Sequence, residues 1–216
     1  MMKMNVSARP VVQCSTGPFW TMDLPEALDV IAEAGFSSIE LMVTRDPRTQ
    51  EPDTPLKLAS ERGLTIGAVH APFLLLTKTV WGVNPLEKIR RGIELCTVVG
   101  ASTLVVHPPY PWERNYARWI KEDLVDFSAP SGVTVGVETM YPLKVRARRI
   151  HGYRWLRPEA LAAAAPHVVL DTSHVAVGGH DLIASYRALA SKLAHVHLSD
   201  NACDGRDGHL EIGRGM

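Results

Sequence analysis

The chain has 216 residues, of which 46% are hydrophobic and 21% are charged, so we expect one globular domain over 1–216 with a full core. Its 23 basic residues balance its 23 acidic residues, which argues against a dedicated nucleic-acid-binding protein. The N-terminal segment lacks the apolar run of a signal peptide, and no stretch reaches membrane-spanning length, so a cytoplasmic protein with no membrane partner is expected. Cys14, Cys96 and Cys203 have no C-x-x-C spacing, which favours reduced, mostly buried thiols.

Strand-like and helix-like segments alternate along the chain. Short apolar runs predict strands over 8–15, 37–43, 64–70, 102–107, 133–139, 167–171 and 194–198. Apolar spacing and end residues predict helices between Asp23 and Gly35, between Thr54 and Gly63, between Asn84 and Gly100, and over 113–127, 158–165 and 181–193. Residues 140–157 are expected to form a long loop. This order predicts a parallel (β/α)8-type TIM barrel with seven strands visible and its last strand-helix unit missing.

Five of the predicted strands end on, or next to, a side chain that can bind a metal. These residues are His70, His107, Glu138, Asp171 and His197, and they recur every 26 to 37 residues. The carboxyl ends of parallel barrel strands meet at one end of the barrel, so the five side chains should converge there. Imidazole and carboxylate together suit zinc, manganese or iron, and magnesium where oxygen ligands dominate.

Other titratable residues extend this pattern. His174 follows Asp171 in a D-x-x-H pair at a strand end, where a turn is expected to direct both side chains into one pocket. The polar C-terminal segment holds a D-x-H pair, Asp207 and His209. His195 shares strand parity with His197 and should point inward, where a role behind the ligands is expected. Glu40 lies near the end of the second predicted strand at the same end of the barrel. It is a candidate for contact with substrate or with the ligands.

These residues carry a family resemblance. The motifs V-H-A-P, V-V-H-P-P, V-E-T-M-Y-P, L-D-T-S-H and H-V-H-L-S-D-N followed by D-G-H-L resemble, in this order, the xylose isomerase-like barrel superfamily. That group includes sugar-phosphate isomerases and epimerases as well as endonuclease IV. The resemblance covers nearly the whole chain, and the segment that begins at H-L-S-D is its most specific part.

The resemblance implies a role for each motif residue. Glu138, Asp171 and His197 match three ligands of the principal metal site. His70 and His107 match the pair that holds a second metal of endonuclease IV with a bridging Glu138. His174, Asp207 and His209 match the ligands of its third metal. In the isomerases and epimerases, which usually keep one metal, the equivalent of His174 contacts substrate instead.

The sequence also departs from the family pattern. The principal site of the family is completed by a glutamate at the end of strand eight, which is also one of two acid/base carboxylates. The sequence ends before that strand, so Glu138 is the remaining candidate base, with His174 as the second candidate catalytic residue. Activity of the chain as it stands is therefore left open.

Two segments bear on the substrate. Residues 144–157 hold six basic residues and no acidic one, and from them Arg146 and Arg149 are candidates for an anion clamp on a sugar phosphate. A solvated basic loop is the alternative. The aromatic residues Tyr110, Trp112, Tyr116 and Trp119 follow His107 and predict a lid or sugar-stacking wall, with Trp112 as the candidate contact. Packing over the barrel rim explains them equally well.

The function predicted from these observations is that of a divalent-metal-dependent isomerase or epimerase of a small sugar or sugar phosphate, which moves a proton through a metal-stabilised enediolate. One zinc, manganese or magnesium ion is expected, with up to three as the alternative. An endonuclease IV-like phosphodiesterase is the second hypothesis, and a catalytically impaired metal-binding barrel is the third. A nucleic-acid partner is not expected, and a homodimer across an open sheet edge stays an alternative to a monomer.

Overall fold

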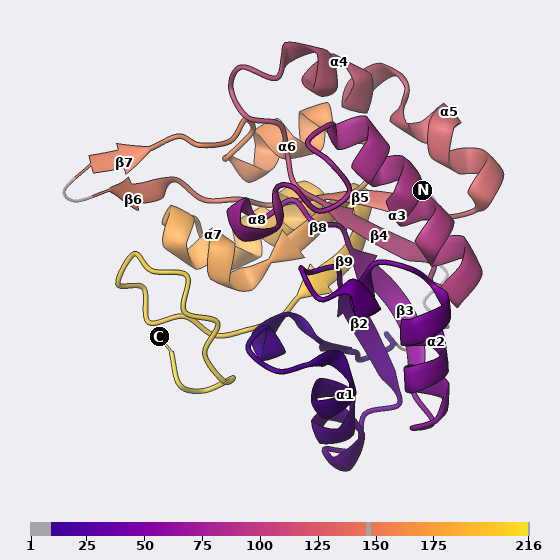
Figure 1. Cartoon of the computed structure of the whole chain (residues 1–216). Coiled ribbons are helices and arrows are strands. Elements are labelled where there is room, and N and C mark those ends of the chain that lie inside the picture. The colour runs from indigo at the N-terminus through magenta and orange to yellow at the C-terminus, as the bar shows by residue number, and fades with distance from the viewer. Residues whose placement is uncertain (1–9, 146–147, 216) are drawn as a thin grey trace, which may run out of the picture.

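The computed structural model describes residues 10–145 and 148–215, with 144–145 and 148–149 described by their backbone. Its main sheet has seven strands in the order β1-β2-β3-β4-β5-β8-β9. The strands are β1 Cys14–Ser15, β2 Ser38–Met42, β3 Thr65–His70, β4 Thr103–Val106, β5 Thr134–Glu138, β8 Val168–Asp171 and β9 Leu193–His197. Every neighbouring pair in this order is parallel. The sheet curls into a half-barrel, and the predicted incomplete TIM barrel is confirmed (Figure 1).

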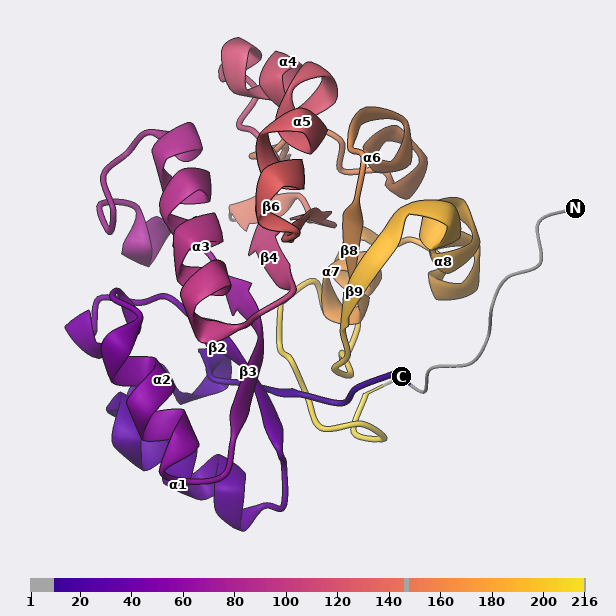
Figure 2. The ribbon, with the colours of Figure 1, turned by 90° about the vertical axis from the view of Figure 1, so that its right-hand side faces the viewer.

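The helices cover the outer face of the curled sheet (Figure 2). They are α1 Leu24–Glu33, α2 Asp53–Ser60, α3 Pro85–Val99, α4 Arg114–Glu122, α5 Leu124–Ser128, α6 Pro158–Ala164, α7 Thr172–Gly178 and α8 Leu182–Leu189. Their ends follow the capping residues of the sequence. Asp23 caps α1 by accepting a hydrogen bond from the backbone of Glu26, and Gly100 ends α3 in the left-handed conformation with φ 78°.

The core forms because the central strands are apolar on both faces. All four residues of β4 and of β8 are buried, one face of each strand lying against the barrel interior and the other against the helices. Among the described residues, no helix is long and apolar enough to span a membrane. None of the cysteines there is in a disulfide, but the prediction of mostly buried thiols holds only for Cys96, because Cys14 is half-buried and Cys203 is exposed.

The structure corrects four element predictions. The loop predicted over 140–157 contains an antiparallel hairpin, β6 Leu143–Val145 and β7 Arg148–Ile150, which projects away from the sheet (Figure 1). Of the strand predicted over 8–15, only Cys14–Ser15 is a strand in the described part of the chain, because pairing with β2 extends no further. The helix predicted over 113–127 is divided at Asp123, whose backbone ends α4.

The fourth correction concerns the residues after Asp171, for which a turn was expected. They form α7, because the Asp171 carboxylate caps this helix by accepting a hydrogen bond from the backbone nitrogen of His174 at 2.8 Å. The strand end and the helix start are thereby joined at one residue. This arrangement sets the direction of the His174 side chain.

The contact between α3 and β4 leads to a stability prediction. A Cβ atom added at Gly92 of α3 would lie 2.7 Å from Cδ1 and 2.8 Å from Cδ2 of Leu104 on β4. Gly92→Ala should therefore destabilise the wild type by overpacking, but it should stabilise a Leu104→Ala variant, in which those methyl groups are gone. We expect a coupling of about 1–3 kcal/mol in a double-mutant cycle measured by urea unfolding. Equal effects of Gly92→Ala in both backgrounds would contradict this close packing.

Candidate metal centre

The five strand-end residues lie together at the carboxyl end of the half-barrel. His70, Glu138, Asp171 and His197 are the last residues of β3, β5, β8 and β9, and His107 directly follows β4. The sheet register explains part of this convergence, since Asp171 pairs directly with His197 across β8 and β9. Four of the side chains are buried, and that of His197 is 17% exposed. The convergence predicted from the spacing is present, and the assignment of these residues as metal ligands stays a prediction.

Glu138 is the centre of the cluster. Its Oε1 accepts a hydrogen bond from His197 Nδ1 at 2.6 Å. Its Oε2 lies 3.5 Å from His70 Nε2 and 3.3 Å from His107 Nε2, yet it accepts no hydrogen bond from any described residue. A buried carboxylate oxygen without a hydrogen bond is costly unless something else satisfies it. An ion between these nitrogens and this oxygen would do so, and nitrogen and oxygen donors suit zinc or manganese, so the residues fit a divalent metal.

Backbone carbonyls orient two of the histidines. His70 Nδ1 lies 2.9 Å from the carbonyl oxygen of Ala71, and His174 Nδ1 lies 2.7 Å from that of Thr139. A carbonyl oxygen only accepts, so in both rings Nδ1 carries the donating hydrogen. The Nε2 atom of His70 is thus directed at Glu138, and that of His174 is directed at Asp207, 3.2 Å away.

Burial and neighbouring charges oppose each other in this cluster. Burial raises the pKa of Glu138, but His197 and His174 outweigh it and hold that pKa well below its ordinary value. Burial lowers the pKa of His197, but Glu40 and Glu138 hold it well above its ordinary value. At His107 burial prevails and the pKa is lowered. Without a metal, positive charge on His197 and His174 balances the Glu138 and Glu40 carboxylates, while burial disfavours the charged form of His107.

The candidate ligands form three adjoining groups, in each of which one donor atom per residue lies within 4.8 Å of the others. The first is His70, His107 and Glu138; the second is Glu138, Asp171 and His197; the third is Asp171, His174 and His209. Glu138 is shared by the first two groups and Asp171 by the last two. Asp207 adjoins the third group, with Oδ2 3.0 Å from His209 Nε2. All eight residues predicted as ligands are therefore contiguous in the structure.

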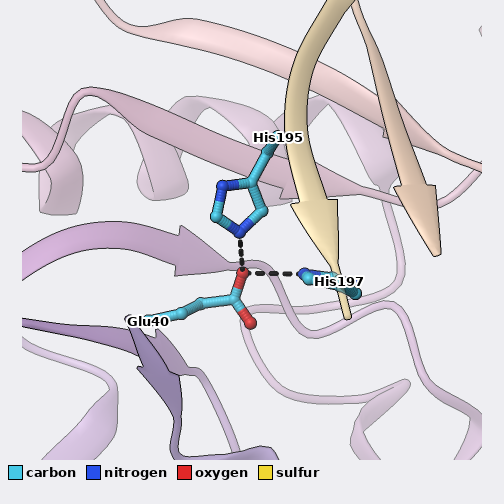
Figure 3. A group of neighbouring side chains, drawn as sticks. All are labelled: Glu40, His195 and His197. Carbon is cyan, nitrogen blue, oxygen red and sulfur yellow. Dashed lines mark hydrogen bonds and ion pairs between the residues drawn. The ribbon is translucent and has the colours of Figure 1, made fainter. Parts of the chain in front are cut away.

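A fourth group lies on the far side of His197. Glu40 Oε2 lies 3.3 Å from His195 Nε2 and 2.8 Å from His197 Nε2 (Figure 3). The inward direction predicted for His195 from strand parity is confirmed. Glu40 is 2% exposed and its carboxylate is occupied by these contacts, so its placement favours the role behind the ligands over contact with substrate.

The aromatic residues after His107 divide into two sets. Tyr116 is buried and Trp119 packs against the core, as rim packing requires. Trp112 is 72% exposed and stacks on Tyr110 with ring centroids 4.9 Å apart. Tyr110 stacks in turn on Tyr153, whose ring meets that of His107 edge-on at 5.8 Å. A continuous row of rings thus leads from the exposed Trp112 to His107, one of the candidate ligands.

An open cleft with a volume of about 410 Å³ lies beside this row. Its walls include His107 and the residues Phe73, Lys78, Lys88, Tyr110 and Tyr153. The cleft is open to solvent, and its aromatic walls with a few polar groups are the usual lining of small-molecule sites.

Two arginines of the basic segment 144–157 make local structural contacts. Arg154 donates hydrogen bonds to the carbonyl oxygens of Tyr110, at 3.3 Å, and of Pro111, so it braces the loop after β4. Arg157 pairs with Glu159 at 3.6 Å. Arg146 lies outside the described residues, as does the side chain of Arg149, so the anion clamp stays a prediction.

Sequence reasoning missed two residues near the centre. Tyr141 donates a hydrogen bond to Asp207 at 3.2 Å and lies against His174 with ring centroids 4.8 Å apart. Its place in V-E-T-M-Y-P, directly after a strand end, is a signal that could have found it. Tyr153 lies in the segment predicted as a loop, and no pattern in the sequence marks its contact with His107.

Comparison with known proteins agrees with this architecture. Residues 28–216 match a family model described as xylose isomerase-like TIM barrel. An uncharacterized protein of Mycobacterium leprae (strain TN) is 33% identical over 229 residues, covering 96% of this chain and 81% of that protein. An uncharacterized protein of Mycobacterium tuberculosis (strain ATCC 25618 / H37Rv) has the same identity and coverage.

Solved structures share the fold at low identity. A D-tagatose 3-epimerase-like protein superposes with a TM-score of 0.70 at 22% identity, covering 94% of this chain and 80% of that one. A 3-keto-D-glucoside 4-epimerase from E. coli gives 0.62 at 16% identity, with 89% and 80% covered. An AP endonuclease of family 2 from Brucella melitensis gives 0.63 at 17% identity, with 85% and 77% covered. The family match over most of the chain, the fold and the order of the strand-end residues agree, and the chain belongs to the xylose isomerase-like TIM barrel family.

Proposed function

We propose that the protein is a divalent-metal-dependent isomerase or epimerase of a small sugar or sugar phosphate. The observation that carries this proposal is the buried Glu138 carboxylate, which is shared by two candidate ligand groups and lies 3.3 Å from His107, a wall residue of the open cleft. Two structural neighbours, a D-tagatose 3-epimerase-like protein and a 3-keto-D-glucoside 4-epimerase, support the reaction class.

Glu138, Asp171 and His197 would hold the principal metal, with zinc, manganese or magnesium as candidates. A divalent ion at this position supplies Lewis-acid polarisation of a sugar oxygen. His70 and His107 would hold a second ion together with Glu138, which is also part of the principal ligand group.

The residues of the chain would bind the sugar and move its proton. The aromatic walls of the cleft, Tyr110 and Tyr153, offer flat faces to the apolar side of a sugar ring, and Trp112 extends this wall outward. Glu138 is the candidate base for a proton next to a carbonyl, and His174 Nε2 is the candidate partner that returns a proton or holds a hydroxyl group.

Metal analysis followed by an isotope-exchange screen tests this function. The purified protein should contain about one equivalent of divalent metal, and in heavy water it should introduce deuterium next to the carbonyl of one ketose or ketose phosphate. Comparison of each sugar with its phosphate ester reports whether an anion clamp exists. A metal-loaded protein that exchanges no proton in any of them contradicts an isomerase and leaves the catalytically impaired metal-binding barrel.

A second candidate function is phosphodiester hydrolysis of the endonuclease IV type. It is favoured by the third ligand group, Asp171, His174 and His209 with Asp207 adjoining it, which a one-metal isomerase does not need. Near three equivalents of zinc, with cleavage of an abasic-site DNA duplex, would favour the nuclease over the isomerase. The balanced charge of the chain counts against it, because backbone phosphates are usually held by excess basic residues.

A further inference from the structure

We propose that Glu40 is a positioning residue for the metal centre: its carboxylate holds the His197 ring so that Nδ1, and not Nε2, faces Glu138 and Asp171. The inference rests on the proposed metal centre and adds to it a residue outside the three ligand groups that contain Glu138 or Asp171. With His195 and His197, Glu40 forms a separate group of possible ligands, in which a metal would meet His197 at Nε2. It also assigns the coordinating atom of His197.

The geometry of His197 carries this inference. Its Nδ1 lies 2.6 Å from Glu138 Oε1 and 3.6 Å from Asp171 Oδ2, within the principal ligand group. Its Nε2 lies on the other side of the ring, 2.8 Å from Glu40 Oε2 (Figure 3). The two ring nitrogens therefore face two different carboxylate environments, and only one of them is a candidate metal site made from strand-end ligands.

Glu40 is itself held in place. Its Oε1 accepts a hydrogen bond from the Ser15 hydroxyl at 2.9 Å, and its Oε2 also contacts His195 Nε2. It lies inside β2, a strand whose first four residues are buried. A carboxylate anchored at both oxygens in a packed strand presents a fixed acceptor to the His197 ring, and a side chain free to rotate would not.

The chemical consequence follows from the donor rules of imidazole. An ionised carboxylate only accepts, so the contact with Glu40 requires a hydrogen on His197 Nε2. When that hydrogen is committed to Glu40, Nδ1 is the nitrogen whose lone pair is left for a metal. Such carboxylate–histidine pairs behind a metal fix both the tautomer and the ring orientation, and their loss commonly weakens metal binding by about 10- to 100-fold.

The alternative role for Glu40 is a purely structural one. The Glu40–His197 bond joins residues 157 positions apart in the sequence and connects β2, beside one edge strand of the sheet, to β9 at the other edge. A tie between the two edges would stabilise the half-barrel whether or not a metal is bound. The test must therefore separate metal affinity from thermal stability.

The experiment measures zinc affinity, without sugar, by competition with a chromogenic chelator. Glu40→Met keeps the volume and removes both acceptors, and its zinc Kd should rise by about 10- to 100-fold. Glu40→Gln keeps one acceptor oxygen in the same shape and should show a smaller rise. Glu94→Met is the matched control, because it makes the same change in an exposed side chain of α3 that pairs with Arg90 outside the barrel, and its Kd should stay within about 3-fold of the wild type.

Nitrogen-15 NMR of the zinc-loaded wild type supplies a second readout. The spectrum of His197 should show the hydrogen on Nε2 and the metal on Nδ1, and Glu40→Gln should shift part of the population toward the opposite tautomer. If Glu40→Met does not fold, Glu40→Gln and this spectrum still decide the question.

Several results would overturn the inference. If the wild type and both Glu40 variants bind zinc with equal affinity, whether or not the variants have a lower Tm, then Glu40 only connects the two edges of the sheet and does not position the metal centre. Zinc on Nε2 in the wild type, or no zinc binding by the wild type at all, would overturn it as well. Glu40-dependent zinc binding without any proton exchange on sugars would contradict the proposed isomerase function and leave the positioning role intact.

Discussion

Glu138→Gln is expected to abolish tight metal binding and to slow sugar proton exchange by on the order of 10³-fold or more, since several kcal/mol of charge stabilisation depend on the bound metal. The substitution keeps the shape of the side chain but removes the negative charge shared by two ligand groups. It also replaces one oxygen with an amide nitrogen, which cannot coordinate the ion. Metal content after dialysis and deuterium incorporation by NMR are the measurements.

Glu94→Gln is the matched control for this variant. Glu94 lies on α3, on the outside of the barrel, where its half-exposed side chain pairs with Arg90. It undergoes the same chemical change far from the cluster and should retain full metal content and exchange. A Glu138→Gln protein that binds zinc with the wild-type affinity and stoichiometry would show that Glu138 is not a ligand.

Addition of zinc is expected to raise the Tm of the metal-free protein by about 5–10 °C at a free concentration near 100 times its Kd. Binding to the folded state alone adds about 2.7 kcal/mol under that condition, and about 2–4 °C per kcal/mol is typical of domains of this size. The physical source is the buried carboxylate and imidazole array, which folding brings together and which the unfolded chain disperses. Thermal unfolding followed by circular dichroism, with and without a chelator, measures the shift.

The size of this shift should depend on pH with a definite sign. Burial lowers the pKa of His174, but Glu138, Asp207 and Asp171 outweigh it and raise that pKa from 6.5 to about 9 in the metal-free protein. Protonated His174 therefore stabilises the folded metal-free protein fully below about pH 6.5, and this stabilisation is lost as the pH rises toward 9. The positive charge of protonated His174, 3.7 Å from Glu138 and 3.9 Å from Asp171, opposes a cation on those carboxylates, so the stabilising effect of zinc should grow over the same interval.

The Glu138→Gln variant again supplies the control, because it should show little or no rise in Tm on addition of zinc at any pH. A rise in Tm that is larger at pH 6 than at pH 8 would contradict competition between zinc and protons at the histidines. An equal rise in wild type and variant would place the zinc outside the Glu138 cluster.

The sheet was predictable because local pattern and global fold agree in it. Each strand of the barrel is a short apolar run bounded by helix signals, and parallel order follows when helices alternate with strands. The convergence of His70, His107, Glu138, Asp171 and His197 follows from the same order, since the carboxyl ends of parallel strands meet at one end of the barrel. To predict this convergence it was enough to know that each of these residues lies at the end of its strand, and the sequence shows this directly.

The hairpin β6–β7 and the helix α7 were not predictable in the same way. Residues 143–148 do alternate apolar and basic side chains, but this short strand signal lies among four basic residues over 144–149, and the two strands pair only with each other and not with the barrel sheet. Helix α7 has seven residues and depends on the Asp171 cap, which looks in sequence like one half of a ligand pair. In both cases the local sequence gave only a weak signal for the element, and the pairing of the two hairpin strands or the Asp171 cap determined the structure.

By itself, the sequence determined the order of strands and helices, the end of the barrel at which the titratable residues gather, and the family to which the chain belongs. Only the tertiary structure decided which atoms meet: that Glu138 is shared by two ligand groups, that an aromatic row leads from Trp112 to His107, and that Glu40 reaches His197 from across the sheet. The physical reason is that strand order follows from local hydrophobic pattern, which every segment carries within itself. Contacts between side chains remote in sequence depend on how the sheet curls and on which ring nitrogen or carboxylate oxygen each neighbour occupies, and no single segment encodes those.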